Sequence, residues 1–123
     1  MRYDYWVIRY VPDPVRGEFV NIGVIAGGGA DWSFRRVSNL GRAAQLGGSA
    51  TTANPFLQRI AASIEARVPG ELGAPFGKGD VEDLRVRMNN LVQLSEARPV
   101  LAVTSEEAVN LAFELMVVDS PPA

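Results

Sequence analysis

Two apolar stretches near the N-terminus alternate with the period of a β-strand and predict a hairpin. Residues 3–11 are rich in aromatic and β-branched side chains, and residues 18–26 form a second run of the same kind. Prolines in the connection cannot donate to a strand ladder, so we expect pairing to stop near Val11. Gly17 suits the positive φ of the return. Neither face of either strand is cleanly polar, which predicts that helices cover both faces of the sheet or that a partner covers one.

Further segments have strand character. Residues 32–37 alternate like a third strand and follow a glycine-rich stretch, residues 27–31, that predicts a flexible turn. A glycine run can hold a phosphate where it leads from a strand into a helix. This run leads into a strand, so we expect no phosphate site there. Residues 92–95 can form a fourth strand, and Pro99 then predicts a sheet edge or an irregular crossing.

Apolar residues at helical spacing predict three helices. The first begins with Asn54 as its N-cap and Pro55 at the first helical position, and it ends at Pro69. Its apolar stripe consists of Phe56, Leu57, Ile60, Ala61, Ile64 and Val68.

The second helix opens at Asp80, after a loop over residues 71–79. Its buried stripe consists of Val81, Leu84, Met88 and Leu91. The third helix follows a capping box, Thr104 with Glu107, and runs to about Val117. Its inward residues are Ala108, Leu111, Ala112, Leu115 and Met116, with Phe113 flanking them.

The region between the third strand and the first helix is less defined. Residues 39–46 form a short helix or a loop, and residues 47–52 form a mobile loop. These elements together predict an α+β fold, in which a small antiparallel sheet packs with about three helices. The sheet is the N-terminal hairpin plus one or two further strands. We expect a single domain over residues 1–118 and a frayed tail over residues 119–123.

Composition narrows the chemistry. The 123-residue chain contains neither cysteine nor histidine, which excludes disulfides, the usual zinc sites and Ser–His or Cys–His catalysis. A carboxylate-bound Mg²⁺ or Mn²⁺ is still chemically possible. We identify no catalytic, cofactor-binding or metal-binding residue. No apolar run approaches the roughly 20 residues of a membrane helix, and no signal peptide is visible, so we expect no membrane association and a cytoplasmic protein.

Charge argues against a nucleic-acid binder. The net charge is −2, with six basic and four acidic groups in residues 1–53 (+2) and six basic and ten acidic groups in the remainder (−4). Nucleic-acid binders usually carry a strong basic patch. Only Arg35, Arg36 and Arg42, with Trp32 nearby, suggest one here, and a solvated strand end explains them more simply.

Three residues are unusual in so apolar a second strand: Glu18, Asn21 and Gly23. Gly23 predicts a bulge or a close backbone approach, Asn21 a hydrogen bond to a neighbouring loop, and Glu18 a contact that holds a turn or loop. A functional alternative is that they belong to a small polar pocket or binding edge. The candidate binding residues on the hairpin are Trp6, Arg9, Tyr10, Arg16, Glu18 and Asn21.

The hairpin sequence also resembles a known family. Residues 3–24 read Tyr-Asp-Tyr-Trp-Val-Ile-Arg-Tyr-Val-Pro-Asp-Pro-Val-Arg-Gly-Glu-Phe-Val-Asn-Ile-Gly-Val, with Pro12 and Glu18 to Val24 as the most characteristic part. This stretch resembles the opening of an uncharacterised bacterial and phage family, domain of unknown function 3037. The resemblance implies a small α+β protein. Some members sit beside genes for proteins resembling HipA kinase-type toxins, which implies a regulatory or interaction role. It carries over no catalytic residue, and Glu18, Asn21 and Gly23 transfer only as motif positions.

Three functions are therefore considered. The first is a protein-interaction or regulatory module without intrinsic catalysis, whose partner is another protein or a second copy in a homodimer. The second is a carboxylate/arginine enzyme or phosphate-ligand binder near Glu18 and Asn21, using Asp4 and Arg9 as well. Alternation places the side chains of Asp4 and Arg9 on opposite faces of the first strand. It places those of Glu18 and Asn21 on opposite faces of the second strand unless a bulge intervenes. The third is a nucleic-acid binder.

Ile60→Ala tests the predicted stripe of the first helix. Truncating a buried isoleucine should lower the free energy of unfolding by about 2–5 kcal/mol, measured by chemical denaturation. A loss below about 1 kcal/mol would show that the stripe faces solvent.

Overall fold

Five antiparallel strands form one sheet in the computed structural model, which describes residues 2–13, 15–66, 77–87 and 91–117. The strands are β1 (Arg2–Asp13), β2 (Glu18–Gly28), β3 (Asp31–Arg36), β4 (Val92–Leu94) and β5 (Arg98–Leu101). Their order is β3-β2-β1-β4, and β5 also pairs with β1. β4 pairs with residues 8–10 of β1 and β5 with residues 2–5, so together they occupy the side of β1 that β2 leaves open.

The predicted hairpin is confirmed. β1 and β2 pair antiparallel, and Gly17 makes the return with a φ of 71°. Pairing does not stop near Val11, however. A register irregularity between Tyr10 and Asp13 absorbs Pro12, and one further pair, Asp13 with Glu18, closes the hairpin.

The predicted bulge lies in the middle of β2. Ile8 pairs with Gly23 and the next residue, Arg9, pairs with Asn21, so Ile22 is the extra residue. A Cβ on Gly23 would lie 3.2 Å from the carbonyl oxygen of Arg35, on β3. Gly23 therefore combines the two features expected of it, a bulge and a close backbone approach.

A second glycine of β2 makes room for an aromatic ring. Trp32 of β3 lies across its cross-strand partner Gly27 and stacks on Trp6 of β1, with ring centroids 5.6 Å apart and planes inclined by 28°. A Cβ on Gly27 would collide with the Trp32 ring. The flexible turn predicted over residues 27–31 is instead a tight return at Gly29 and Ala30, since β2 extends to Gly28 and β3 begins at Asp31. Gly29 takes the positive φ of this turn, 58°.

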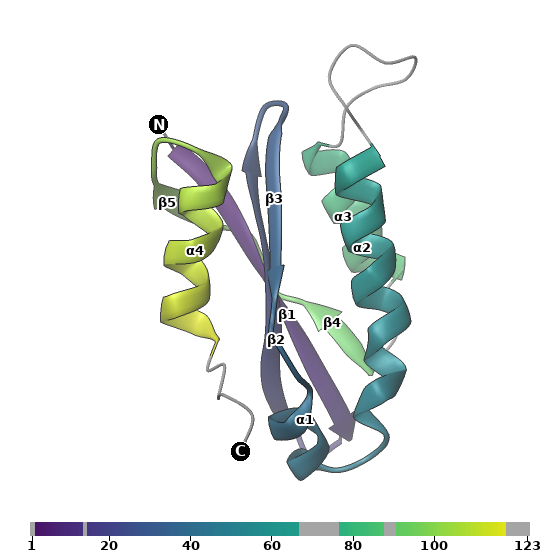
Figure 1. The fold of residues 1–123 in the computed structure, drawn as a ribbon. Helices are drawn as coiled ribbons and strands as arrows, with labels where there is room; N and C mark the ends of the chain where they lie inside the picture. Colours follow the sequence, from purple (N-terminus) through teal and green to yellow (C-terminus); the bar gives the residue numbers. More distant parts are fainter. Residues whose placement is uncertain (1, 14, 67–76, 88–90, 118–123) are drawn as a thin grey trace.

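Helices lie on both faces of the sheet. They are α1 (Gly41–Leu46), the 3₁₀ helix η1 (Ala50–Ala53), α2 (Asn54–Ala66), α3 (Lys78–Arg87) and α4 (Ser105–Met116). Figure 1 shows α4 on one side of the sheet and α2 with α3 on the other. This arrangement explains the two apolar faces of the hairpin, because consecutive β1 residues, Trp6, Val7 and Ile8, are all 0% exposed. The α+β class and the antiparallel sheet are as expected from the sequence.

The buried face of α4 differs from the predicted one. Leu111 and Leu115 were expected inside but are 39% and 76% exposed, whereas Val109 and Phe113 are buried. Ala108 and Ala112 bring the helix close to the sheet, and Ser105 fixes its rotation through hydrogen bonds to Asp31. The wide apolar surface of this helix left its rotation undetermined in the sequence.

The start of α2 also differs. Asn54 is not an N-cap, because its backbone is already helical (φ −55°, ψ −45°) as the end of η1. Its side chain instead accepts a hydrogen bond from Arg36 at 2.8 Å. Residues 47–52 therefore include a 3₁₀ turn rather than a wholly irregular loop, and Ala50 and Ala53 pack into the core. Residues 39–46, for which a helix or a loop was possible, contain α1.

The other two helices follow the predicted patterns with small shifts. Leu57 and Ile60 of α2 and Val81 of α3 are buried. Leu91, predicted in the buried stripe of the second helix, is instead half-buried and lies outside α3, directly before β4. The predicted second helix, α3, begins at Lys78, two residues before the predicted start at Asp80. Asp80 accepts a hydrogen bond from the Gly77 amide and so caps the helix from its third position. Val68, Met88 and the tail over residues 119–123 lie outside the described residues.

Gly27→Ala should destabilise the protein by about 1–3 kcal/mol, since the added methyl group displaces the Trp32 ring from Trp6. The matched control is Gly79→Ala in α3, where a Cβ meets nothing within 4 Å and stability should be equal or slightly higher. Urea denaturation of both variants checks this. Equal stability of Gly27→Ala and wild type would contradict the proposed close packing.

Candidate binding groove along the outer edge of β3

Two of the sequence-predicted binding residues are core residues. Trp6 and Tyr10 are 0% exposed. Trp6 stacks on Trp32, and the Tyr10 hydroxyl donates to the carbonyl of Gly47 at 2.9 Å. Their aromatic surface is therefore already occupied by the chain's own residues, and it does not form a docking face.

Arg9 and Asn21 come together but serve packing. They are cross-strand partners, and the Arg9 guanidinium lies 4.6 Å from the centre of the Phe19 ring. The Asn21 side-chain amide donates to the carbonyl of Met116 at 2.6 Å. The predicted loop contact of Asn21 is thus a contact with the last turn of α4. In the described part of the chain, Arg9 Nε and Asn21 Oδ1 are buried without a hydrogen-bond partner.

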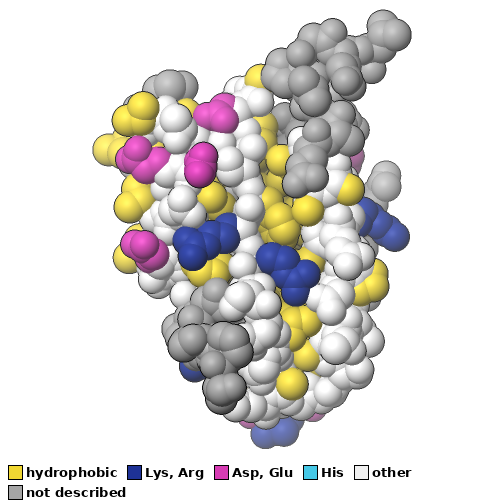
Figure 2. Space-filling model, viewed as in Figure 1, with side chains coloured by type: hydrophobic (Ala, Val, Ile, Leu, Met, Phe, Trp, Pro, Cys, Tyr) yellow, Lys and Arg dark blue, Asp and Glu magenta, His cyan; other side chains and the backbone are white. Residues whose placement is uncertain are grey.

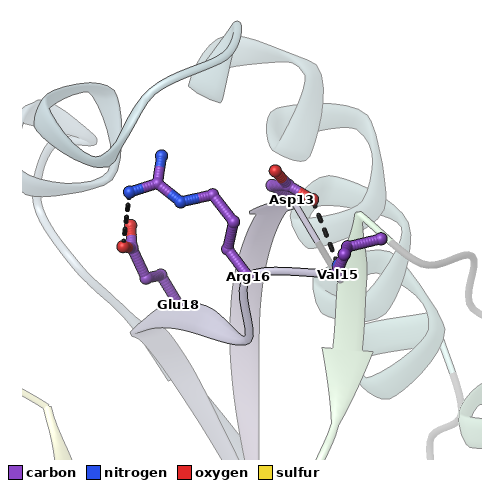
Figure 3. A network of polar contacts seen from close by, with 4 residues as sticks. All are labelled: Asp13, Val15, Arg16 and Glu18. Carbon is purple, nitrogen blue, oxygen red and sulfur yellow. Dashed lines mark hydrogen bonds and ion pairs between the residues drawn. The ribbon is translucent and has the colours of Figure 1, made fainter.

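Arg16 and Glu18 lie at the exposed end of the hairpin. Figure 3 shows the Arg16 guanidinium donating to the Glu18 carboxylate, at 2.8 Å, and Asp13 accepting from the amide of Val15. The two charged side chains are 66% and 44% exposed, so the pair contributes little stability. Glu18 holds a loop contact, as expected. The bulge begins beyond Asn21, so Glu18 and Asn21 still point to opposite faces and do not form one site.

The structure assembles a different surface instead, a groove along β3. Its volume is about 390 Å³, and its walls come from three elements that are distant in sequence. β3 contributes Trp32, Ser33, Phe34 and Arg35, α2 contributes Ala61 and Ile64, and α4 contributes Glu106, Val109 and Asn110. Figure 2 shows apolar side chains exposed between the two helical layers, basic side chains in the middle of this view, and acidic side chains over α4.

The main chain of β3 is open toward this groove. The amide of Val37 donates to Ile22, so the hydrogen-bonding groups of residues 31, 33, 35 and 37 point toward β2. By the alternation of an antiparallel ladder, the N–H and C=O groups of Phe34 and Arg36 point the other way. Within the described ranges, no main-chain group pairs with them on that side. β3 is therefore an edge strand that lies between two helices.

The two arginines of β3 project to opposite faces. Arg35 donates to the side-chain oxygen of Asn110 at 3.0 Å and lies 4.0 Å from the centre of the Phe113 ring, both on α4. Arg36 donates to Asn54 at 2.8 Å, at the start of α2. Their contacts are with neutral groups, and neither forms an ion pair with any carboxylate that the structure describes.

A polar network fixes α4 as one wall of the groove. Asp31 accepts hydrogen bonds from the amide of Ser105 at 2.8 Å, from the hydroxyl of Ser105 at 2.7 Å and from the hydroxyl of Tyr3 at 3.1 Å. Ser33, on the groove side, lies 2.6 Å from the Ser105 oxygen and donates to it, since the Ser105 hydrogen is directed to Asp31. Thr104 accepts from the amide of Glu107, which confirms that half of the predicted capping box. The network joins β1, β3 and the first turn of α4.

The electrostatics of this network suit a structural role. The hydrogen bond from the Ser105 hydroxyl is the main cause that lowers the pKa of Asp31, partial desolvation opposes it, and the Ser105 amide and Tyr3 lower the pKa further. Burial, followed by the hydrogen bond to Asp31, raises the pKa of Tyr3. Asp31 is thus held as a carboxylate that accepts hydrogen bonds at a helix N-terminus, which makes it a poor general base for Ser33.

The described residues give no support to a nucleic-acid surface or a metal site. Arg42 lies in α1, Arg35 faces α4 and Arg36 faces α2, so the three do not form a continuous basic stripe, and α4 adds acidic side chains beside them. The described residues contain no group of three or more Asp or Glu side chains suited to a metal ion. Nor is any helix in the described ranges both long enough and apolar enough to cross a bilayer.

Asp31→Asn should lower the free energy of unfolding at pH 7 by about 0.5–2 kcal/mol, because it weakens the cap of α4. A carboxyl group with a lowered folded-state pKa stabilises the fold above its unfolded pKa and loses that contribution as pH falls through the folded value. The difference between wild type and variant, measured by denaturation at several pH values, should therefore shrink below about pH 4. Asp83→Asn, at an exposed position on α3, controls for the loss of one charge. A pH-independent difference would contradict the role of the carboxylate.

A family model described as "Protein of unknown function (DUF3037)" matches residues 5–117. No curated protein and no solved structure matches the chain. The resemblance carried by residues 3–24 is therefore confirmed, and it extends from β1 to the end of α4. On this evidence the chain belongs to the DUF3037 family, whose function is unknown.

Proposed function

We propose that this protein is a small interaction module, without catalysis of its own, that binds an extended polypeptide segment along the outer edge of β3. The observation that carries the proposal is the open main chain of Phe34 and Arg36 beside a groove. Extended peptides commonly bind proteins by adding a strand to such an edge, where main-chain hydrogen bonds give affinity and side-chain pockets give specificity.

The groove has the dimensions and lining that this mode needs. A volume of about 390 Å³ falls within the range of ligand sites, and its length follows the strand rather than leading to a closed cavity. Ile64 and Ala61 supply an apolar wall on the α2 side, whereas Asn110 and Glu106 supply a polar wall on the α4 side. Side chains of an added strand alternate between these two walls.

The opposite edge of the sheet is less suited to strand addition. The Val7 amide donates to the Ser95 hydroxyl, and the Val7 carbonyl accepts from the Ser95 amide. The main-chain N–H and C=O groups of the odd-numbered β1 residues therefore point toward β4 and β5. Pro99, which pairs with Asp4, then points outward and offers no N–H to a further strand. Proline on an edge strand is a common protection against pairing with other chains. The expected sheet-edge role of Pro99 agrees with this geometry.

A library of random twelve-residue peptides displayed on phage tests the proposal. Wild type should enrich binders, and Ala61→Arg should lose them because the new side chain fills the groove. The matched control is Ala62→Arg, the adjacent exposed position on α2, which does not line the groove. Failure to enrich any peptide on wild type, or equal enrichment on all three proteins, would refute the proposed function.

A further inference from the structure

We infer that the β3 groove selects an acidic extended segment, in which two consecutive carboxylate side chains lie opposite Arg36 and Arg35 and an apolar side chain follows opposite Phe34. This inference rests on the proposed function and names the chemistry of the partner. It commits to a peptide segment of another protein as the occupant.

The first argument is charge. Arg35 lines the groove, and Arg36 is the next residue of β3, directly beyond the lining. Their polar contacts are with the side chains of Asn110 and Asn54 and with a main-chain carbonyl, so two positive charges lie where the groove ends. Arg35 is exposed and Arg36 is half-buried, so both can take a further hydrogen bond from a ligand. Guanidinium donors bind carboxylates and phosphates strongly, and carboxylates are the ones that an unmodified peptide carries.

The second argument is spacing. Arg35 points to the α4 side of the sheet and Arg36 to the α2 side, because each contacts the helix on its own face. Consecutive residues of an added strand also point to opposite faces. A single acidic residue could therefore meet one arginine only, whereas two consecutive acidic residues meet both.

The third argument sets the direction. Glu106 lines the opposite end of the groove on the α4 side, one helical turn before Asn110, and it would repel a carboxylate placed there. The next position toward that end, opposite Phe34, faces Ile64 and Ala61 and suits an apolar side chain. In the commoner antiparallel pairing, the peptide carries two acidic residues opposite Arg36 and Arg35, then an apolar residue opposite Phe34. A small, uncharged residue follows opposite Ser33.

A labelled peptide with the core Glu-Glu-Val-Thr-Val between Gly-Ser flanks is the probe, with binding followed by fluorescence anisotropy. Arg35→Gln and Arg36→Gln should each weaken binding about threefold to fivefold. Arg59→Gln, an exposed arginine of α2 outside the groove, should leave binding unchanged. A peptide with Lys-Lys in place of Glu-Glu should bind wild type less tightly than the Glu-Glu peptide binds wild type or any of the three variants. Equal affinity for the Glu-Glu and Lys-Lys peptides would overturn the inference.

Backbone methylation separates strand addition from simple charge attraction. The amide of the central Val, opposite Phe34, points toward β3, so its N-methylation should weaken binding about tenfold or more. The amide of the following Thr, opposite Ser33, points away, and its N-methylation should be tolerated. Equal effects at both positions would overturn the assigned register.

The outcomes distinguish this inference from the proposed function. Displayed peptides that enrich on the groove but lack acidic pairs would leave the interaction module standing and reject the acidic motif. A chain that is dimeric in analytical ultracentrifugation, and that Ala61→Arg but not Ala62→Arg converts to a monomer, would show that a second copy occupies the groove and would overturn the peptide assignment.

Discussion

The hydrogen bonds from Ser105 to Asp31 are the contacts on which the arrangement of the groove depends. Asp31 begins β3, and Ser105 begins α4, so a single carboxylate ties the edge strand to the helix beside it. The contact sets both the position and the rotation of α4, and it thereby directs Val109 and Phe113 inward and Asn110 toward Arg35. On the other face, Gly27 has no side chain, so Trp32 can lie across β2 and stack on Trp6, which ties β3 to β1. These two contacts position β3 relative to α4 on one face and relative to the core on the other face.

Much of the fold follows from the sequence, because strand alternation and helical stripes are strong in this chain. The hairpin, the bulge at Gly23, the third and fourth strands and the three longer helices could all be predicted from local pattern. The rotation of α4 could not, since Leu111 and Leu115 are as apolar as Val109 and Phe113, and only the distant Asp31 distinguishes them. The N-cap predicted at Asn54 is wrong for a related reason, because the 3₁₀ turn before it is stabilised by burial of small alanines, Ala50 and Ala53, that carry little pattern of their own.

The candidate site was less predictable than the fold. Sequence directed attention to conspicuous residues of the hairpin, yet Trp6 and Tyr10 are conspicuous because they fill the core. The groove depends on strand order and on which helix covers which face, and neither is encoded locally. Adjacent arginines at the end of an alternating strand were the available signal, and they gained meaning only once β3 was found at the edge.

The pairing of β1 with both β4 and β5 has a consequence for how the chain reaches this structure. β1 is synthesised before the other strands of this sheet, but one of its two edges is completed only by residues 92–101, and the Tyr3 hydroxyl donates to the carbonyl of Val103, a hundred positions later. Contacts of such long sequence separation form late and slow folding. One edge of this apolar strand therefore stays unpaired until nearly all of the domain has been synthesised. During that interval the nascent chain is most prone to aggregate.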